Sequence, residues 1–315
     1  MGIVDRSLTA IDRQLSEFVS ARSDIASLIC LPFAMNPVAK ALWYIESHYE
    51  RDIALEDIAN CAGVSRFHLL RAFGAATGKS IMRYVRGRRL TEAAKHLVDG
   101  AEDILSVAIE SGYGSHEAFT RAFREQFGVT PESLRRQHSL ENIQLTEPFT
   151  MNAISMTDLA SPRFVDSPLL LVAGLHQHFD CETSGGGIPG LWQRFGAWLG
   201  HIPGQVGKTA YGVCYNTDES GNLDYLCGVE VEEFSGLPAE FSSLRIPAQH
   251  YAVFLHADHV SSIRSSWNAV WNMWLPQSGH HCADAPFFER YPETFDPQSG
   301  QGGVELWVPL ADSST

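Results

Sequence analysis

The strongest constraint on the fold of this chain is a duplication between Leu55 and Pro131. The first copy runs from Ala59 to Gly78 and has the order Ala-x-x-x-Gly, Arg-x-Phe, Gly. The second copy repeats that order from Ala108 to Gly128, with one residue inserted in its central turn. Each copy predicts a short apolar helix, a tight turn that holds Gly, and a second helix with an apolar and a polar edge. This pattern indicates two helix-turn-helix units in tandem.

Charge separates the duplicated region from the rest of the chain. The 315 residues carry a formal net charge of −14, but residues 37–139 hold 14 of the 23 Lys and Arg residues and are close to neutral. Residues 140–315 hold 6 Lys and Arg residues against 20 Asp and Glu residues. Tandem helix-turn-helix units are typical of DNA-binding proteins. Because this region has no net positive field, its binding to DNA must depend on where individual arginine side chains point. The acidic part would repel nucleic acid, so we expect another role for it.

We predict a multidomain α and α+β protein, in which an all-α tandem helix-turn-helix domain precedes a duplicated βαββ antiparallel-sheet domain. The expected parts are an N-terminal helical extension at 1–36, the helix-turn-helix domain at 37–139, a linker at 140–154 and the sheet domain at 155–315. No apolar run reaches the roughly 20 residues of a membrane span. The N-terminus lacks a signal-peptide pattern, and the six cysteines form no CxxC pair. We therefore expect a cytoplasmic protein with reduced thiols.

The N-terminal extension has the pattern of a long helix. Residues 3–30 contain neither Gly nor Pro, and apolar residues recur at alternating spacings of four and three from Val4 to Ile29, with Arg22 as the exception. This heptad seam predicts a homodimer through a coiled coil; the alternative is a helix that lies on its own chain.

The second helix of each unit has an inward and an outward edge. Leu69 and Phe73 should face the core in the first unit, and Phe119 and Phe123 in the second. The outward edges should be formed by Phe67, Leu70 and Arg71, and by His116, Glu117, Thr120 and Arg121. The helix between the units carries Arg83, Arg86, Arg88 and Arg89, which form either a solvated face or a set of phosphate contacts.

The first unit, from Leu55 to Phe73, resembles the first half of the AraC family DNA-binding domain, and Ala122–Pro131 resembles its C-terminal signature. The resemblance covers the predicted helix-turn-helix domain. It implies that both second helices enter the major groove of promoter DNA, about one helical turn apart. Position by position, the family's base-reading sites fall on the two outward edges named above. RNA polymerase is a further candidate partner of such a regulator.

The chemistry of these edges is uneven. Arg71 and Arg121 can each hold guanine O6 and N7 with two hydrogen bonds. Phe67 and Leu70 can only press on thymine methyls or on the sugar. Glu117 either accepts a hydrogen bond from cytosine N4 or is a solvent-facing acid.

A second, weaker duplication lies in the acidic part. Trp192 and Trp267, and Phe195 and Val270, keep one offset of 75 residues. The pattern of each half predicts a strand, a helix and two further strands, in that order. Two such units predict one antiparallel sheet with helices on one face and a cleft along the symmetry axis.

The acidic part resembles the GyrI-like effector-binding domain from Ser155 to Leu310, and the domain order is that of Rob-like regulators. The motifs that carry the likeness are Gln249–Phe254, Ser266–Trp271, Phe288–Tyr291 and Leu306–Leu310. The family implies multidrug sensing, in which an acid within an aromatic cleft binds a small lipophilic, cationic effector. Glu289 sits at the matching position. Aromatic walls attract delocalised cations, and the candidates are Trp192, Tyr211, Tyr215, Trp267 and Tyr291.

Several alternatives stay open. The tryptophans can be core residues, and Glu289 can be an exposed acid. Some GyrI-like proteins are hydrolases, so a DNA-tethered hydrolase of a small reactive molecule is one alternative to a regulator without enzyme activity. A ligand-blind regulator controlled by partner binding or sequestration is another. His176-x-His178-x-x-Cys181 and His280-His281-Cys282 lack the spacing of a metal site, so we expect neither a metal nor another cofactor.

Overall fold

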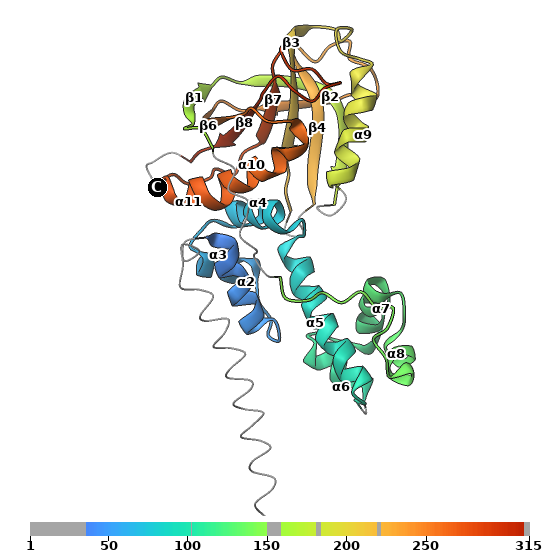
Figure 1. The fold of residues 1–315 in the computed structure, drawn as a ribbon. Coiled ribbons are helices and arrows are strands. Elements are labelled where there is room, and N and C mark those ends of the chain that lie inside the picture. Colours follow the sequence, from blue (N-terminus) through green and yellow to red (C-terminus); the bar gives the residue numbers. More distant parts are fainter. Residues whose placement is uncertain (1–35, 102, 150–158, 181–183, 219–221, 312–315) are drawn as a thin grey trace, which may run out of the picture.

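The computed structural model describes residues 36–101, 103–149, 159–180, 184–218 and 222–311 (Figure 1). A helical part comes first along the chain, and a part built on one antiparallel sheet follows it. This arrangement confirms the predicted fold class. The heptad seam lies in residues 1–35, outside the described residues, so the dimer remains a prediction, as do the bounds of the four parts. Within the described residues, no helix combines the length and apolar character that a membrane crossing requires.

The first helix-turn-helix unit follows one supporting helix. The elements are α2 (Pro37–His48), α3 (Leu55–Ala62) and α4 (Arg66–Thr77). Gly63 ends α3 with φ 73°, in the left-handed region that favours glycine, which allows the tight turn. Ser65 caps α4, because its side chain accepts a hydrogen bond from the His68 backbone N–H at 3.3 Å.

The second unit is joined to the first by the long helix α5. The elements are α5 (Ile81–Val98), α6 (Ile104–Glu110), α7 (His116–Phe127) and α8 (Pro131–Gln137). Ser115 caps α7 by accepting from the Ala118 N–H at 3.2 Å. Phe119, Phe123 and Phe127 are buried on one side of α7 and pack on one another. The apolar spacing of this helix therefore builds the core of the second unit.

Eight strands form one antiparallel sheet in the order β1-β6-β8-β7-β3-β4-β2-β5. The strands are β1 (Arg163–Ser167), β2 (Leu170–Phe179), β3 (Gln205–Tyr215), β4 (Leu223–Val231), β5 (Ser242–Ile246), β6 (Gln249–His256), β7 (Phe287–Tyr291) and β8 (Val304–Pro309). Strands β2, β3 and β4 belong to the first predicted unit and β6, β7 and β8 to the second, with β3 and β7 paired at the centre. The edge strands are exchanged, because β1 pairs with β6 and β5 pairs with β2.

Each unit of the sheet places its helix on the same side as Glu289. These helical elements are α9 (Ser184–Gly196), η2 (Val260–Ser262), α10 (Ile263–Ala269), η3 (Val270–Trp274) and α11 (Leu275–Gln277). Helix α9 packs on β2 and β4. The second helix contains a π-helical turn, η3, between α10 and α11. Such turns occur frequently at functional sites.

The two parts of the molecule share a core. Leu69 and Phe73 of α4 belong to the same buried cluster as Trp271, Leu275 and strand residues of β6 and β8. Helix α4 packs directly against α10 and η3, whereas α7 lies at the end of the helical part that is remote from the sheet (Figure 1). The two helix-turn-helix units therefore have different surroundings.

Candidate DNA interface and effector site

The outward edge of α7 is open to solvent. His116, Glu117 and Arg121 are exposed, and Thr120 is half-buried. A surface depression of about 630 Å³ at this edge is lined by His116, Glu117, Thr120, Arg121, Arg124, Glu125 and Thr130. The structure therefore brings the four predicted residues of the second unit together on one accessible surface. Their contact with bases stays a prediction.

The side-chain oxygens of Glu117 and Thr120 have different surroundings on this edge. Hydrogen bonds from its own backbone N–H and from Ser115 hold the pKa of Glu117 below its ordinary value, so the side chain is ionised at neutral pH. The Thr120 hydroxyl is buried and has no hydrogen-bond partner among the described residues. A base contact through Thr120 Oγ1 would therefore require rotation of that side chain.

The corresponding edge of α4 is covered by the C-terminal domain, which contradicts the prediction that Arg71 points outward. Arg71 Nη1 donates to Cys282 Sγ at 2.7 Å, and Nη2 donates to the Ala285 carbonyl oxygen at 2.9 Å. The guanidinium carbon lies 5.5 Å from the ring centroid of Trp271 and 4.8 Å from that of Phe287. Both terminal nitrogens of Arg71 thus donate to protein groups, and aromatic rings lie against its guanidinium. In this arrangement Arg71 cannot contact a base.

The apolar residues of this edge are not open either. Leu70 is 8% exposed and belongs to the cluster shared by the two parts of the molecule, so its predicted outward position is wrong in this structure. Phe67 is half-buried, and the Arg66 guanidinium lies 4.8 Å from the centroid of its ring. The sequence suggested that the apolar residues of the α4 edge contact thymine. Their apolar character fits burial against protein instead.

The arginines of α5 are mostly held by protein groups. Arg88 is buried, and its Nε lies 3.1 Å from both carboxylate oxygens of Glu46. Arg83 Nη1 lies 2.5 Å from Asp180 Oδ2, which links α5 to the sheet domain. Arg89 donates to two backbone carbonyls of the loop between α2 and α3. These contacts favour a structural role over the phosphate contacts that the sequence left open.

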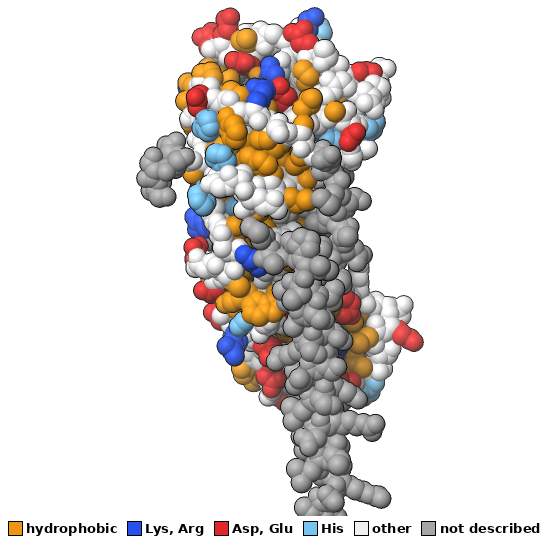
Figure 2. All heavy atoms as spheres, turned by 60° about the vertical axis from the view of Figure 1, so that its left-hand side comes forward, with side chains coloured by type: hydrophobic (Ala, Val, Ile, Leu, Met, Phe, Trp, Pro, Cys, Tyr) orange, Lys and Arg blue, Asp and Glu red, His pale blue; other side chains and the backbone are white. Residues whose placement is uncertain are grey.

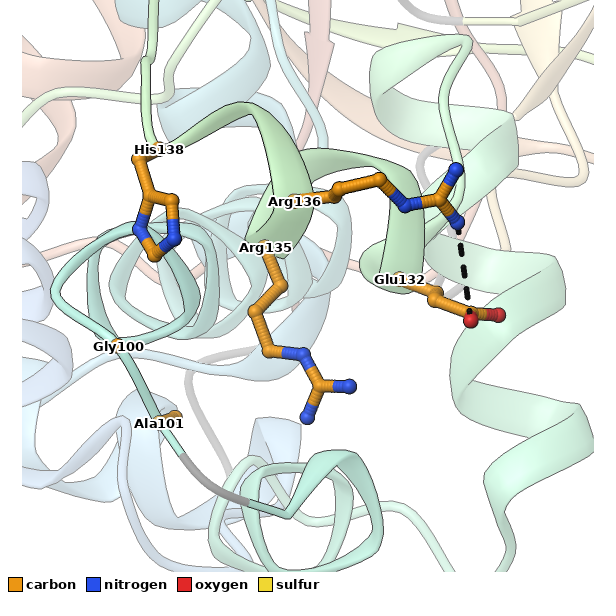
Figure 3. A pocket seen from close by; sticks show the side chains of 6 residues that line it. All are labelled: Gly100, Ala101, Glu132, Arg135, Arg136 and His138. Atoms are coloured by element: carbon orange, nitrogen blue, oxygen red, sulfur yellow. Dashed lines mark ion pairs between the residues drawn. The ribbon is translucent and has the colours of Figure 1, made fainter.

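A smaller depression of about 320 Å³ lies at the end of α8 (Figure 3). Gly100 and Ala101 line one side of it. Arg135 contributes a positive charge, and His138 contributes an imidazole ring. Arg136 points away toward Glu132, with Nη2 3.7 Å from Oε1 (Figure 3). On the face of the molecule shown in Figure 2, Lys and Arg side chains are interspersed with Asp and Glu and form no continuous basic surface. On this face, a DNA contact would therefore depend on the placement of single arginines.

Glu289 lies at the centre of a cluster of hydrogen-bond donors. Trp267 Nε1 donates to its Oε1 at 2.9 Å, and the hydroxyls of Tyr291 and Tyr225 donate to its Oε2 at 2.8 and 3.2 Å. Glu289 keeps part of its surface accessible, although its carboxylate is surrounded by protein atoms. This crowding raises the pKa of Glu289 above its ordinary value, and the three donors act in the opposite direction.

Trp192 completes the cluster from the other half of the domain. Its Nε1 donates to the Tyr225 hydroxyl at 3.0 Å, and its ring centroid lies 4.8 Å from that of Tyr291. The structure thus brings together four of the six predicted effector residues, from α9, α10 and β7. They surround one carboxylate with aromatic rings.

Tyr211 and Tyr215 are on the opposite face of the sheet, which contradicts their prediction as cleft walls. In the β3–β7 pair, Gly212 is opposite Glu289, so the neighbouring Tyr211 points the other way. Tyr211 and Tyr215 pack in a separate apolar cluster that contains Phe288. Strand alternation is the physical reason, because residues two apart share a face and adjacent residues do not.

The sequence missed two residues that shape the cluster. Tyr225 of β4 links Trp192 to Glu289, as described above. Gly212 is required beside it, because a Cβ at this position would lie 2.1 Å from the Tyr225 hydroxyl oxygen and 3.1 Å from Glu289 Oε2. Strand parity relative to Glu289 could have indicated Gly212, but only once the pairing of β3 with β7 was known.

The histidines of β2 contact an acid. His176 Nε2 and His178 Nδ1 lie 3.2 and 2.9 Å from Asp224 Oδ1. Cys181, the third member of that motif, lies outside the described residues. In the described part of the chain, no three His, Cys, Asp or Glu residues are arranged to hold a metal ion.

Comparisons with known proteins match both parts of the chain. A model described as a GyrI-like small molecule binding domain matches residues 160–311, and a helix-turn-helix domain model matches residues 58–137. The transcriptional regulator Rob of Salmonella typhimurium is 25% identical over 273 residues, which are 84% of this chain and 93% of the relative. The right origin-binding protein of Escherichia coli K12 is 24% identical over 281 residues, or 85% and 96% of the two chains. The multiple antibiotic resistance protein MarA of Salmonella typhimurium is 37% identical over 92 residues, or 29% of this chain and 72% of MarA.

Proposed function

Because this chain belongs to the AraC family of helix-turn-helix regulators and carries a GyrI-like small-molecule-binding domain, we propose that it regulates promoters in response to a small lipophilic cation. Family membership makes the chain a DNA-binding transcriptional regulator. The chemistry of the effector and the residues that bind it are our proposal.

The observation that carries the proposal is the position of Glu289 among aromatic donors. A carboxylate in such a site favours a cation, because a partner charge offsets its desolvation. The rings of Trp192, Trp267 and Tyr291 attract a delocalised cation through their π faces. An anion would gain neither contribution, and a strongly hydrated inorganic cation would have to give up its water to gain the charge pairing.

Calorimetric titration with two ions of the same shape tests this chemistry. Tetraphenylphosphonium should bind the full-length protein, and tetraphenylborate should not. Glu289→Gln removes the charge with little change of shape and should weaken phosphonium binding at least about tenfold. Glu293→Gln, at an exposed position nearby, is the matched control and should bind as the native protein does. Equal binding of the two ions, or normal binding by Glu289→Gln, would refute the proposed effector class.

Two further readouts separate the alternatives. A DNA-tethered hydrolase would consume its ligand, so mass spectrometry of candidate compounds after incubation should show loss of compound. A ligand-blind regulator would show no rise in melting temperature with any member of a lipophilic-cation panel. The proposed regulator raises its melting temperature and leaves the compound intact.

For DNA, we propose that the α7 edge reads bases in the major groove. Arg121 is exposed and can hold guanine O6 and N7. His116, Glu117 and Thr120 lie beside it at the same depression. Contact with RNA polymerase and a homodimer through the N-terminal segment remain predictions.

A further inference from the structure

We propose that DNA and the C-terminal domain compete for the same edge of α4, so that the first helix-turn-helix unit is held off DNA while the two domains are docked. The inference rests on the DNA-binding function above and assigns a regulation to it. Helix α4 would have to present the edge that includes Arg71 in order to enter the major groove. That edge is the one that α10, η3 and residues 282–287 cover.

Directional hydrogen bonds fix the docking along the middle of α4. His68 Nε2 lies 2.6 Å from the carbonyl oxygen of Trp271. Asn272 Nδ2 donates to the carbonyl oxygen of Ala72 at 3.0 Å. Both contacts are buried, so they define one orientation of α4 against η3 rather than a loose apolar contact.

The C-terminal end of α4 receives a cation from the other domain. Arg264 of α10 donates from Nη2 to the Gly74 carbonyl at 3.0 Å and from Nε to the Ala75 carbonyl at 3.2 Å. A cation is favourable at a helix C-terminus, where backbone carbonyls carry partial negative charge. The last turn of α4 has no basic residue of its own, whereas α7 has Arg124 there. Helix α4 therefore receives the cation at its C-terminal end from the C-terminal domain, whereas α7 carries such a cation in its own sequence.

The docked form also contains features that weaken it. Arg71 Nε and Asn272 Oδ1 are buried without a hydrogen-bond partner among the described residues. An unsatisfied buried polar atom is unfavourable relative to its state in water. Both atoms lie at the contact between α4 and the C-terminal domain, and both would regain water if the domains separated. Docking that includes such atoms is suited to a reversible contact.

The open α7 edge gives the order of events. Arg121 is available while Arg71 is bound to protein, so the second unit engages DNA first. The first unit follows only when α4 leaves α10 and η3, and the binding energy of DNA for the α4 edge is the differential interaction that drives the change. The affinity for DNA is then reduced by the fraction of molecules that are docked.

A charge-reversal pair tests the competition in the full-length protein. The probe is a DNA duplex selected by the protein from a random pool, and the readout is its dissociation constant by fluorescence anisotropy. Arg264→Glu places a negative charge against the carbonyl end of α4 and should loosen the docking. Arg245→Glu makes the same charge change at an exposed position on β5 and is the matched control. We expect Arg264→Glu to bind at least about fivefold more tightly than Arg245→Glu.

A second variant and the pattern of results make the test decisive. Asn272→Asp replaces the Nδ2 donor with a carboxylate oxygen that faces the Ala72 carbonyl. It should therefore also bind DNA more tightly than the native protein, with melting curves used to verify that each variant is folded. If Arg264→Glu and Arg245→Glu bind equally and Asn272→Asp binds no more tightly than the native protein, the competition is refuted. If no variant and not even the native protein selects a sequence, it is the DNA-reading function that fails.

Discussion

Helices α4 and α7 occupy equivalent places in the two helix-turn-helix units, and their inner sides are alike. Each begins after a serine cap and ends at a glycine with positive φ. Phe73 of α4 and Phe123 of α7 are fully buried. The duplicated sequence therefore determines the geometry of both helices in the same way.

The outer edges differ. Arg71 of α4 is bound to the C-terminal domain, while Arg121 of α7 faces solvent. Leu70 of α4 corresponds to Thr120 of α7. The apolar residue lies on an edge that packs against the C-terminal domain, and the polar residue lies on an edge that is open to solvent. The availability of a recognition helix is thus decided by the neighbouring domain and not by the repeat itself.

The largest expected effect tests the shared core. Phe73→Ala and Phe123→Ala should each lower the free energy of unfolding by about 3–5 kcal/mol, because each leaves a cavity at a fully buried position. Urea unfolding measures both. Phe73→Ala should also loosen the C-terminal domain, since Phe73 shares a cluster with Trp271. A loss below about 1 kcal/mol for either variant would show that the two cores are not equivalent.

The next effect separates the edges. Arg121→Ala should weaken DNA binding by about 1–3 kcal/mol and relax specificity at one base position. Arg71→Ala should cause a smaller net loss, because it removes a docking contact together with any base contact. Anisotropy with the selected duplex and its single-base variants measures both. Equal losses for the two variants would contradict the difference between the edges.

A pH effect should be confined to α4. His68 corresponds to Ala118 in α7, so only α4 carries a titratable group at this position. Burial is the main cause that lowers the pKa of His68 to about 4; the nearby Arg71 and His281 act in the same direction, and the hydrogen bond to the Trp271 carbonyl opposes them. Undocked His68 should titrate near its ordinary pKa of about 6.5.

The sign follows from proton uptake. Between pH values of about 6.5 and 4 the undocked form binds a proton that the docked form does not. Docking is at full strength above this range and weakens as pH falls, by up to about tenfold per pH unit. Hydrogen exchange at about pH 7 and pH 5.5, corrected for intrinsic rates, should show lost protection in α4 but not in α7. His68→Gln should abolish the difference, and a change of the same size in both helices would exclude this origin.

The smallest expected effect couples the effector to DNA. Trp267 donates to Glu289, its ring stacks on Trp271 with centroids 5.5 Å apart, and Trp271 contacts Arg71. A cation that pairs with Glu289 displaces the Trp267 N–H and should loosen α4. We expect tetraphenylphosphonium to raise DNA affinity about fivefold, within the usual range of allosteric coupling. The Glu289→Gln variant should show no response, and an unchanged affinity of the native protein would exclude the coupling.

Local patterns in the sequence predicted most elements of both domains. Gly63 and Gly112 marked the two turns, and the matched spacing from Trp192 to Trp267 marked the two halves of the sheet. The edge strand β5 was missed. Its five residues, Ser242–Ile246, are short and mixed in polarity, and they pair with β2 of the other half, so nothing local indicates them.

The candidate sites were predicted only in part, for two physical reasons. Tyr211 and Tyr215 were placed on the wrong face, because the face of a strand residue depends on pairing across the sheet, here Gly212 with Glu289. Arg71 was expected to be exposed, because the helical pattern shows an outward edge but not which domain covers it. Both errors concern contacts between segments far apart in the sequence.

The most direct test of the central claim is hydrogen exchange of residues 263–274 in the full-length protein, with and without the selected DNA duplex. If DNA and the C-terminal domain compete for the α4 edge, DNA binding frees α10 and η3, and their backbone amides should exchange faster in the complex than in the free protein. Unchanged or slower exchange of these residues at saturating DNA, with α7 protected, would show that α4 remains docked on bound DNA and would contradict the account.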